Sequence, residues 1–296
     1  MSDFGEAGKA QSVAVPIAGT DPQPHIVDQL IAERGTKIVH SRFWPVLRPF
    51  LHKILRYDEA VEMADRLAPL PTRPAMEYLS ELLHLDLRIE GRENIPRSGG
   101  FVLAANHPTG IADGVAVYDA LFPTRPDIAI FTNRDAVRVN PRLSDVLIPV
   151  EWREEFRNHT KAKETLRLSS RAFREGRAVV IFPSGRIAFW KDNKLNERPW
   201  QVSAVTLARK YGVPVLPVNV QARNSSLFYW FANWNTELRD MTVFNELLNK
   251  RGKTFRIRFG PMIAAERIAE GDPAEMTAAL QDYTVHSLAR DAAAPF

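Results

Sequence analysis

The chain contains no cysteine among its 296 residues. This absence excludes disulfide bonds, thiolate metal sites and a cysteine nucleophile, and it fits a reducing compartment. Long apolar runs are also missing, and none approaches the roughly 18 to 20 residues that a membrane-spanning helix needs. Residues 1–6 lack the basic start and apolar run of a secretory signal. The sequence therefore predicts a cytoplasmic protein that is soluble or bound to a membrane surface.

Motifs for metals and nucleotides are absent as well. The six histidines other than His107 show no metal-ligand spacing to one another or to carboxylates. No glycine-rich nucleotide loop occurs either. We therefore expect no metal and no cofactor. The net charge of +4 favours anionic partners. However, the basic residues are dispersed and form no recognised nucleic-acid-binding module, so we expect no nucleic-acid partner.

The composition that remains is that of a folded protein, with 45% hydrophobic and 25% charged residues. No linker or abrupt change of composition divides the chain. Residues 1–24 are polar or small and predict a disordered lead-in, and residues 25–84 have a helical, proline-interrupted pattern. We expect residues 85–296 to form one catalytic domain behind this helical N-terminal extension.

Within the extension, residues 43–57 mix aromatic, aliphatic and basic side chains. On a helix, Arg48, His52 and Arg56 would form one stripe, and the aliphatic residues would cluster on another. Such a segment can lie in a lipid headgroup layer, or its apolar face can cover the catalytic core; the two interpretations are compatible. Pro49 argues against one unbroken helix here.

After residue 84, strand patterns alternate with helix patterns. This alternation predicts an α/β fold with a largely parallel central sheet flanked by helices. Strands are expected at 85–90, 101–105, 128–132, 146–150, 178–182, 215–220 and 255–259. Helices are expected at 112–121, 160–175, 201–211, 236–249 and 273–291.

Residues 106–114, Asn-His-Pro-Thr-Gly-Ile-Ala-Asp-Gly, carry the strongest chemical signal. His107 directly follows a buried type of strand, where open α/β sheets place their sites. Asp113 falls in the first turn of the next helix, where its carboxylate can accept a hydrogen bond from the histidine. That bond fixes the tautomer and leaves the other ring nitrogen as a general base. The alternative is an ordinary turn in which Asp113 only caps the helix.

A second signal follows the strand expected at 178–182. The Pro-Ser-Gly turn there exposes backbone N–H groups beside Arg186. Such a turn can hold a phosphate or carboxylate, with the arginine giving bidentate contacts. A plain turn with a solvated arginine is the alternative. Ser184 does not fit a serine-hydrolase nucleophile, because Phe182 stands where that motif requires glycine.

Together these segments resemble the glycerolipid (PlsC-like) acyltransferases, over roughly residues 85–263. The first block of that family is an Asn-His followed by an Asp at the head of a helix. Residues 148–153, 181–186 and 213–218 look like its second, third and fourth blocks, in order. The resemblance implies that His107 and Asp113 are catalytic. It also implies that four residues bind substrate: Arg153, Ser184, Gly185 and Arg186.

Two departures from the family pattern bear on the acceptor. Five residues separate His107 from Asp113 where four are usual, and Ser184 replaces the usual glutamate, with Arg186 one position early. The wider spacing resembles a bacterial haemolysin-like branch that includes lyso-ornithine lipid acyltransferases. Residues 224–229 and 248–253 also look like that branch.

The resemblance implies direct acyl transfer without an acyl-enzyme, in membrane lipid synthesis at the inner face of the cell membrane. The donor would be acyl-ACP or acyl-CoA, and the acceptor a lysolipid, foremost 1-acyl-glycerol-3-phosphate or a related lysophospholipid. Lyso-ornithine lipid is the alternative acceptor. Backbone donors near Gly110 or Gly185 would stabilise the oxyanion. A catalytically inert membrane-binding protein is the alternative of another class, and the intact His-Asp pair speaks against it.

Overall fold

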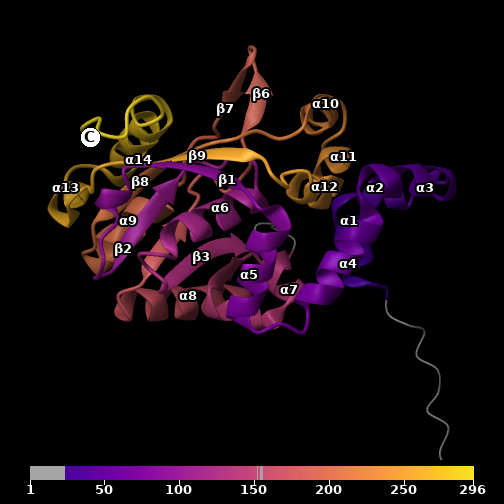
Figure 1. Ribbon diagram of the computed structural model, residues 1–296, viewed down its shortest axis with the longest axis horizontal. Coiled ribbons are helices and arrows are strands. Elements are labelled where there is room, and N and C mark those ends of the chain that lie inside the picture. Colours follow the sequence, from indigo (N-terminus) through magenta and orange to yellow (C-terminus); the bar gives the residue numbers. More distant parts are fainter. Residues whose placement is uncertain (1–23, 152, 154–155) are drawn as a thin grey trace, which may run out of the picture.

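The structure, a computed structural model, describes residues 24–151, 153 and 156–296. The lead-in expected at residues 1–24 lies outside these residues, apart from Pro24. The rest of the chain alternates strands and helices, as Figure 1 shows. The seven predicted strands are all present, and each ends within one residue of its expected limits. They are β1 (Asp86–Glu90), β2 (Phe101–Ala105), β3 (Ile128–Asn133), β4 (Leu147–Val150), β5 (Ala178–Ile181), β8 (Val215–Gln221) and β9 (Thr254–Phe259).

These strands form one sheet in the order β1-β9-β8-β2-β5-β3-β4. Only the β8–β9 pair is antiparallel, so the predicted largely parallel α/β sheet is confirmed. Because β2, β3, β5 and β8 run parallel, their carboxyl ends meet at one edge. The loop that holds His107 leaves the sheet at this edge.

Alternate residues of the central strands point to opposite faces of the sheet, which is the geometry of a pleated strand. In β2, Leu103 packs on the side of α5 (Thr72–Leu83) and α6 (Ile111–Leu121). Its neighbour Val102 packs on the side of α8 (His159–Arg174), α9 (Ser203–Tyr211) and α14 (Pro273–Asp282). Both faces are therefore covered, which explains why the central strands are apolar throughout.

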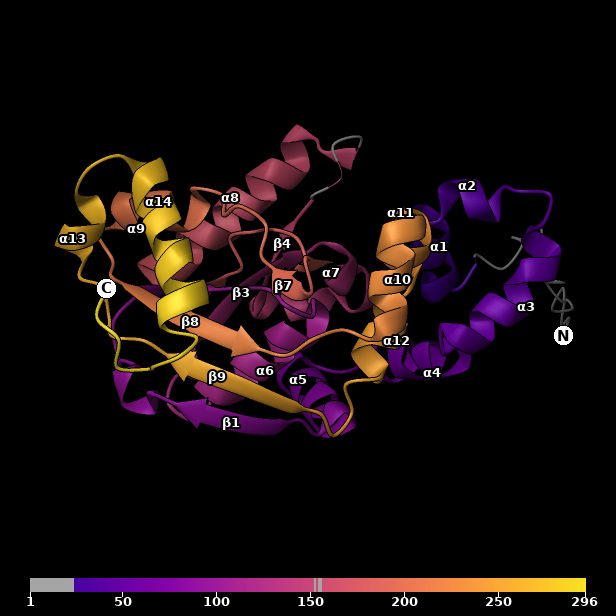
Figure 2. The same ribbon diagram turned by 90° about the horizontal axis from the view of Figure 1, so that it is seen from above.

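The N-terminal extension is helical, as predicted. Its helices are α1 (Ile26–Arg34), α2 (Thr36–Val39), α3 (Trp44–Ile54), α4 (Tyr57–Leu67) and α5. In Figure 2, α1 and α2 lie beside α10 (Ser226–Trp234) and α11 (Thr236–Met241), at one end of the sheet. None of the helices in the described part of the chain is long and apolar enough to cross a membrane.

The expectation that Pro49 breaks the helix is wrong, because α3 continues through it to Ile54. Pro49 is exposed, so the carbonyl that loses its partner on the preceding turn can reach solvent. The chain turns instead at Arg56, which has a left-handed conformation with φ 53°.

Two other predicted helices are interrupted. The one expected at 236–249 divides into α11 and α12 (Val243–Leu248), because the Thr242 hydroxyl donates to the Arg239 carbonyl at the break. The one expected at 273–291 is α-helical only to Asp282 and then widens into a π-helical turn, Tyr283–Ser287.

Several of the described elements have no counterpart in the prediction. Among them are α7 (Asp135–Val139), α10, α13 (Ala265–Ala269) and the hairpin of β6 (Phe189–Lys191) with β7 (Lys194–Asn196). The hairpin projects from the sheet edge that holds His107, as seen at the top of Figure 1. It therefore contributes to the site.

Candidate active site

His107 and Asp113 lie together as the sequence predicts. Nδ1 of His107 is 3.0 Å from Oδ2 of Asp113, although the angle falls short of a straight hydrogen bond. Hydrogen bonds of this kind are often poorly aligned without substrate. With Nδ1 directed at the carboxylate, Nε2 is the nitrogen left to accept a proton. The imidazole also packs on Phe182, with ring centroids 4.4 Å apart.

The Asp113 carboxylate is fully buried but well supplied with donors. It accepts hydrogen bonds from the backbone N–H groups of Thr109 (2.8 Å) and Gly110 (3.0 Å) and from the Thr109 hydroxyl (2.5 Å). Asp113 is the third residue of α6, so it also caps this helix. One side chain therefore both caps α6 and lies against His107. The interpretation of Asp113 as a helix cap and its interpretation as the partner of His107 are compatible.

The backbone of His107 is held on both sides. Its carbonyl accepts from the N–H of Ala188 (2.9 Å), and its N–H donates to Oε1 of Glu197 (3.1 Å). These bonds join the histidine to both ends of the segment that carries the β6–β7 hairpin. The position of His107 thus depends on a part of the chain some eighty to ninety residues further on.

Glu197 is the site residue that the sequence analysis missed. Besides the His107 N–H, its carboxylate contacts Ser184, the residue that stands where the family usually has glutamate. Burial raises the pKa of Glu197, and the contacts with Ser184 and His107 oppose this shift in part. The departure at Ser184 signalled a missing carboxylate, but no spacing in the sequence points to position 197.

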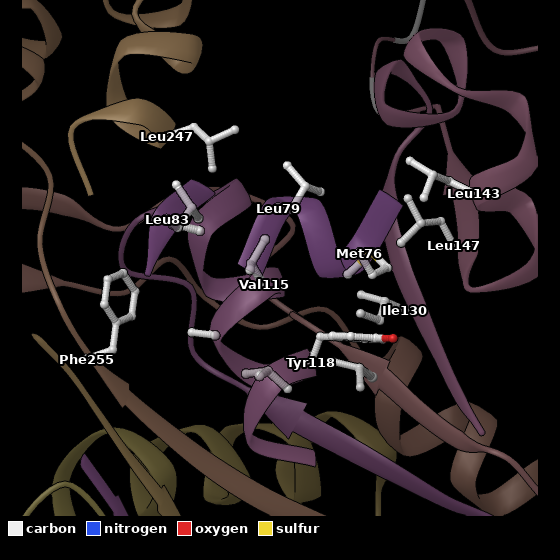
Figure 3. Packing of buried hydrophobic residues seen from close by; sticks show 14 of the residues in the cluster. Met76, Leu79, Leu83, Val115, Tyr118, Ile130, Leu143, Leu147, Leu247 and Phe255 are labelled. Atoms are coloured by element: carbon white, nitrogen blue, oxygen red, sulfur yellow. The ribbon is translucent and has the colours of Figure 1, made fainter. Parts of the chain in front are cut away.

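A cavity of about 670 Å³ opens beside His107. Its inner wall is apolar and comes from α5, α6, β3, the short helical turn Pro141–Asp145 and β4. Figure 3 shows how the residues of this wall pack. The residues of this wall are Met76, Leu79, Val115, Ile130, Leu143 and Leu147. We call it the apolar cavity. Its size and lining suit a small or chain-like apolar ligand. Two wall residues, Met76 and Leu79, belong to the N-terminal extension.

The polar mouth of the apolar cavity contains three of the predicted substrate-binding residues. Ser184 is buried, and its hydroxyl donates to the Arg186 carbonyl (2.8 Å), which closes the turn after β5. Gly185 adopts φ 60° at the exposed tip of this turn, and Arg186 is exposed beside it. The structure therefore brings Ser184, Gly185 and Arg186 together with His107 around one opening.

Arg153 lies apart from these residues, in a buried network of charges. Its guanidinium contacts the carboxylates of Glu33 (2.6 Å), Asp135 (3.1 Å) and Glu151 (3.1 Å). Arg34 contacts Asp135 as well, at 2.6 Å. Burial has the largest single effect on the pKa of Arg153 and lowers it. The carboxylates together outweigh this effect, so the pKa is raised. Arg153 does not line the apolar cavity, whereas Arg157 does.

Backbone donors near Gly110 or Gly185 were expected to stabilise an oxyanion, but the N–H groups of these two glycines are used within their own turns. The Gly110 N–H donates to Asp113, and the Gly185 N–H donates to the Phe182 carbonyl (3.0 Å). Gly110 has another role, because it adopts φ 96° and a Cβ there would lie 2.8 Å from the Ile187 side chain. Within the described residues, no cluster of histidine and carboxylate side chains has the arrangement of a metal site.

The comparisons with known proteins agree with this geometry. Residues 86–221 match the model of the Acyltransferase family, so the chain carries a domain of that family. This segment contains His107, Asp113 and the turn after β5. The part of the chain that matches this family is therefore the part that holds the candidate site.

Two curated relatives are named for acyl transfer to lipids. Over 220 residues, 72% of this chain and 79% of the relative, the chain is 23% identical to a lyso-glycine lipid O-acyltransferase of Bacteroides thetaiotaomicron. It is 21% identical to a 1-acyl-sn-glycerol-3-phosphate acyltransferase of Borreliella burgdorferi, over 75% of this chain and 80% of that one. Among solved structures, PlsC of Thermotoga maritima, a 1-acyl-sn-glycerophosphate acyltransferase, aligns over 90% of this chain and 98% of its own. The TM-score is 0.46 at 16% identity.

Proposed function

We propose that this protein transfers a fatty-acyl group from an acyl thioester to the hydroxyl of a lysolipid. One observation supports this most directly: the His107 imidazole, 3.0 Å from the Asp113 carboxylate, stands at the mouth of the apolar cavity. A general base next to a space for a hydrocarbon chain suits an enzyme that handles one polar and one apolar reactant.

In the proposed mechanism, Nε2 of His107 takes the proton of the acceptor hydroxyl. The oxygen attacks the thioester carbonyl carbon, and the C–S bond then breaks. The departing thiolate takes the proton from the imidazolium, so the base is restored and no acyl-enzyme forms. Asp113 stabilises the imidazolium during this exchange, and help of this kind is typically worth about 10²–10⁴ in rate.

The chemistry of the cavity mouth supports a proposal for the acceptor. Arg186 and Arg157 at the cavity mouth favour an anionic head group, as a lysophospholipid such as 1-acyl-glycerol-3-phosphate provides. The lyso-glycine lipid O-acyltransferase among the relatives instead favours an acceptor built on an amino acid, the class to which lyso-ornithine lipid belongs. The donor is acyl-ACP or acyl-CoA.

The protein is proposed to work as a peripheral protein at the inner face of the cell membrane, with α3 as its contact. Four apolar residues of this segment are between 41% and 79% exposed: Phe43, Val46, Leu47 and Phe50. Arg42, Arg48 and Lys53 accompany them. Aromatic and aliphatic side chains next to basic ones suit an anionic lipid surface.

A direct test supplies the purified protein with several lysolipids and with acyl-ACP or acyl-CoA, and identifies the products by mass spectrometry. We expect an O-acylated lipid with the wild-type protein and none with the His107→Ala variant, which should remain folded. Product formation by the purified variant would end this mechanism. Vesicle binding without any product, across all donors and acceptors, would instead indicate the catalytically inert membrane-binding protein.

A further inference from the structure

A second cavity lies past the end of β8, the strand that pairs with β2. Its volume is about 810 Å³, and it opens between the β6–β7 hairpin, the end of β8, the first turn of α10 and the end of α12. Strand β8 lies beside β2, and two hydrogen bonds between Asn106 and Val220 (2.9 and 2.7 Å) join their ends. The second cavity therefore begins only a few residues past the strand next to His107.

All ionisable side chains that line this second cavity are cationic: Arg223, Lys250 and Lys253. We call it the cationic cavity. Lys250 is buried and paired with the buried Glu246, at 3.0 Å. Arg223 and Lys253 are exposed, and neither forms an ion pair with any residue that the structure describes. The lining thus has two positive charges without a protein counter-ion, which favours an anionic ligand.

Asn224 gives a second and independent indication of a ligand. It lines the cationic cavity with only 4% of its surface exposed, yet both its Oδ1 and its Nδ2 lack hydrogen-bond partners among the described residues. Buried amides almost always have partners. The backbone N–H of Asn224 is used, since it donates to the Tyr229 hydroxyl (3.1 Å). The side-chain amide is therefore an unpartnered donor and acceptor in the wall of the cavity.

The first turn of α10 adds backbone donors at the same place. Ser225 caps this helix, with its hydroxyl oxygen accepting from the Phe228 N–H (3.2 Å), and its own N–H donates to Glu246 (2.9 Å). In the described part of the chain, the N–H groups of Ser226 and Leu227 have no such partner. Ser226 lines the cavity. Helix N-termini with available N–H groups bind phosphate and other oxyanions.

We propose that the cationic cavity binds a phosphate ester carried by one of the two substrates. Arg223, Lys253 and the start of α10 would contact the phosphate, and Asn224 a hydroxyl or amide next to it. The phosphate belongs either to the phosphopantetheine arm that acyl-CoA and acyl-ACP share, or to the head group of a lysophospholipid. The proposal rests on the proposed function, because it places the polar part of a substrate outside the apolar cavity, which is proposed to take the hydrocarbon chain.

Binding to the His107→Ala protein tests the proposal without turnover. Isothermal titration calorimetry would compare 4′-phosphopantetheine with pantetheine, and glycerol 3-phosphate with glycerol. We expect one phosphate ester to bind at least about tenfold more tightly than its phosphate-free counterpart, because hydrogen bonds to an ionised group are stronger than those between neutral groups. Introducing Arg223→Ala and Lys253→Ala into the His107→Ala protein should remove this preference for the phosphate ester. Equal affinity for both members of each pair would overturn the proposal.

Steady-state kinetics on the active enzyme identifies the source of the phosphate. We expect the Arg223→Ala/Lys253→Ala variant to raise one KM about tenfold or more and to leave kcat within about twofold. A higher KM for acyl-CoA, but not for acyl-pantetheine, assigns the site to the donor. A higher KM only for a phosphate-bearing lysolipid assigns it to the acceptor. If no KM changes, or if phosphate-free substrates are affected equally, the proposal is wrong.

Two further variants complete the design. Asn224→Leu removes an unpartnered buried amide without shortening the side chain, so we expect it to fold and to weaken phosphate-ester binding. Lys210→Ala removes one exposed cation from α9, remote from the cavity lining, and should change no affinity. An inactive wild-type protein that still binds the phosphate ester would contradict the proposed function and leave this inference standing.

Discussion

Arg153 lies 2.6 Å from Glu33, so the end of the second block is joined to the first helix of the N-terminal extension. Asp135 and Glu151 complete its shell of carboxylates. An arginine surrounded in this way is suited to hold two parts of the chain together. The family pattern assigns the same residue to the acceptor site, and the two roles predict different outcomes.

We expect Arg153→Lys to destabilise the protein by about 2 kcal/mol, because an ammonium group cannot reach three carboxylates as a planar guanidinium does. Urea unfolding measures this loss, and KM for the lysolipid should stay within about twofold. Arg186→Lys is the matched control: Arg186 is exposed at the cavity mouth, so its loss should raise KM and spare stability. A stable Arg153→Lys enzyme with a raised KM would place Arg153 in substrate binding.

Asp113→Asn should lower kcat/KM by about 10²–10⁴ because the amide no longer stabilises the imidazolium, although it can still accept from the Thr109 and Gly110 N–H groups. Asp119→Asn is the control on the same helix, since Asp119 bonds to Ser80 and not to His107. Initial rates at saturating and limiting acceptor would separate kcat from KM. Nearly equal rates for the two variants would argue against the dyad.

The raised pKa of Glu197 predicts how stability depends on pH. Burial favours the protonated form in the fold, so this group stabilises the protein most below its ordinary pKa of 4.5. The contribution is lost as the pH rises through the higher pKa of the folded state. Glu197→Gln removes the ionisation and keeps an oxygen to accept from the His107 N–H. We expect the Tm of this variant, relative to wild type, to rise between pH 4.5 and neutrality.

Thermal unfolding in a series of buffers gives that comparison. A Tm difference that is constant across this range would mean that Glu197 titrates normally in the folded protein. Activity provides a second measurement, since the amide preserves the hydrogen bond that holds His107. Rates within a few-fold of wild type are expected at neutral pH.

Gly114 lies within α6 and lines the apolar cavity, and a Cβ there would meet no atom within 4 Å. Gly114→Ala should therefore stabilise the protein, by up to about 1 kcal/mol, as expected for this exchange within a helix. Gly114→Leu should fill part of the cavity and shift the preference towards shorter acyl chains. Competition among thioesters of graded length measures this shift, and an unchanged product distribution would show that the chain binds elsewhere.

Val46→Ser and Phe50→Ser on α3 should each weaken binding to phosphatidylglycerol vesicles about tenfold, the factor expected from roughly 1.5 kcal/mol of lost apolar burial. Leu166→Ser on α8 is the control, because Leu166 is 62% exposed, close to the 64% of Phe50, but belongs to another helix. Sedimentation with vesicles measures the affinities. Equal losses for all three variants would indicate a nonspecific apolar effect and not a membrane-binding helix.

The sheet and the dyad could be predicted because they depend on local patterns. Buried parallel strands are apolar throughout, and a histidine after one strand meets an aspartate only six residues later. Glu197 could not be predicted in the same way. It reaches the backbone of His107 through a hairpin whose short strands have no distinctive pattern, and a contact across ninety residues depends on the whole fold.

Helix ends were predicted less well for a related reason. Pro49 is a strong helix breaker in isolation, but an exposed position lets α3 tolerate it. The break at Thr242 reflects one side-chain hydrogen bond, and the π-helical turn at Tyr283 accompanies the contact of Asn219 with the Thr284 carbonyl. Such choices depend on tertiary neighbours that a periodic pattern does not contain.

The position of α5 has a practical consequence for protein engineering. Met76 and Leu79 form part of the wall of the apolar cavity, so a truncated protein that starts at residue 85 would lose this part of the wall together with α3. A chimera that exchanges only the exposed apolar segment around α3 with a relative should be joined between α3 and α4, near the left-handed Arg56. A junction there changes the exposed segment and keeps Met76 and Leu79 in the wall of the apolar cavity.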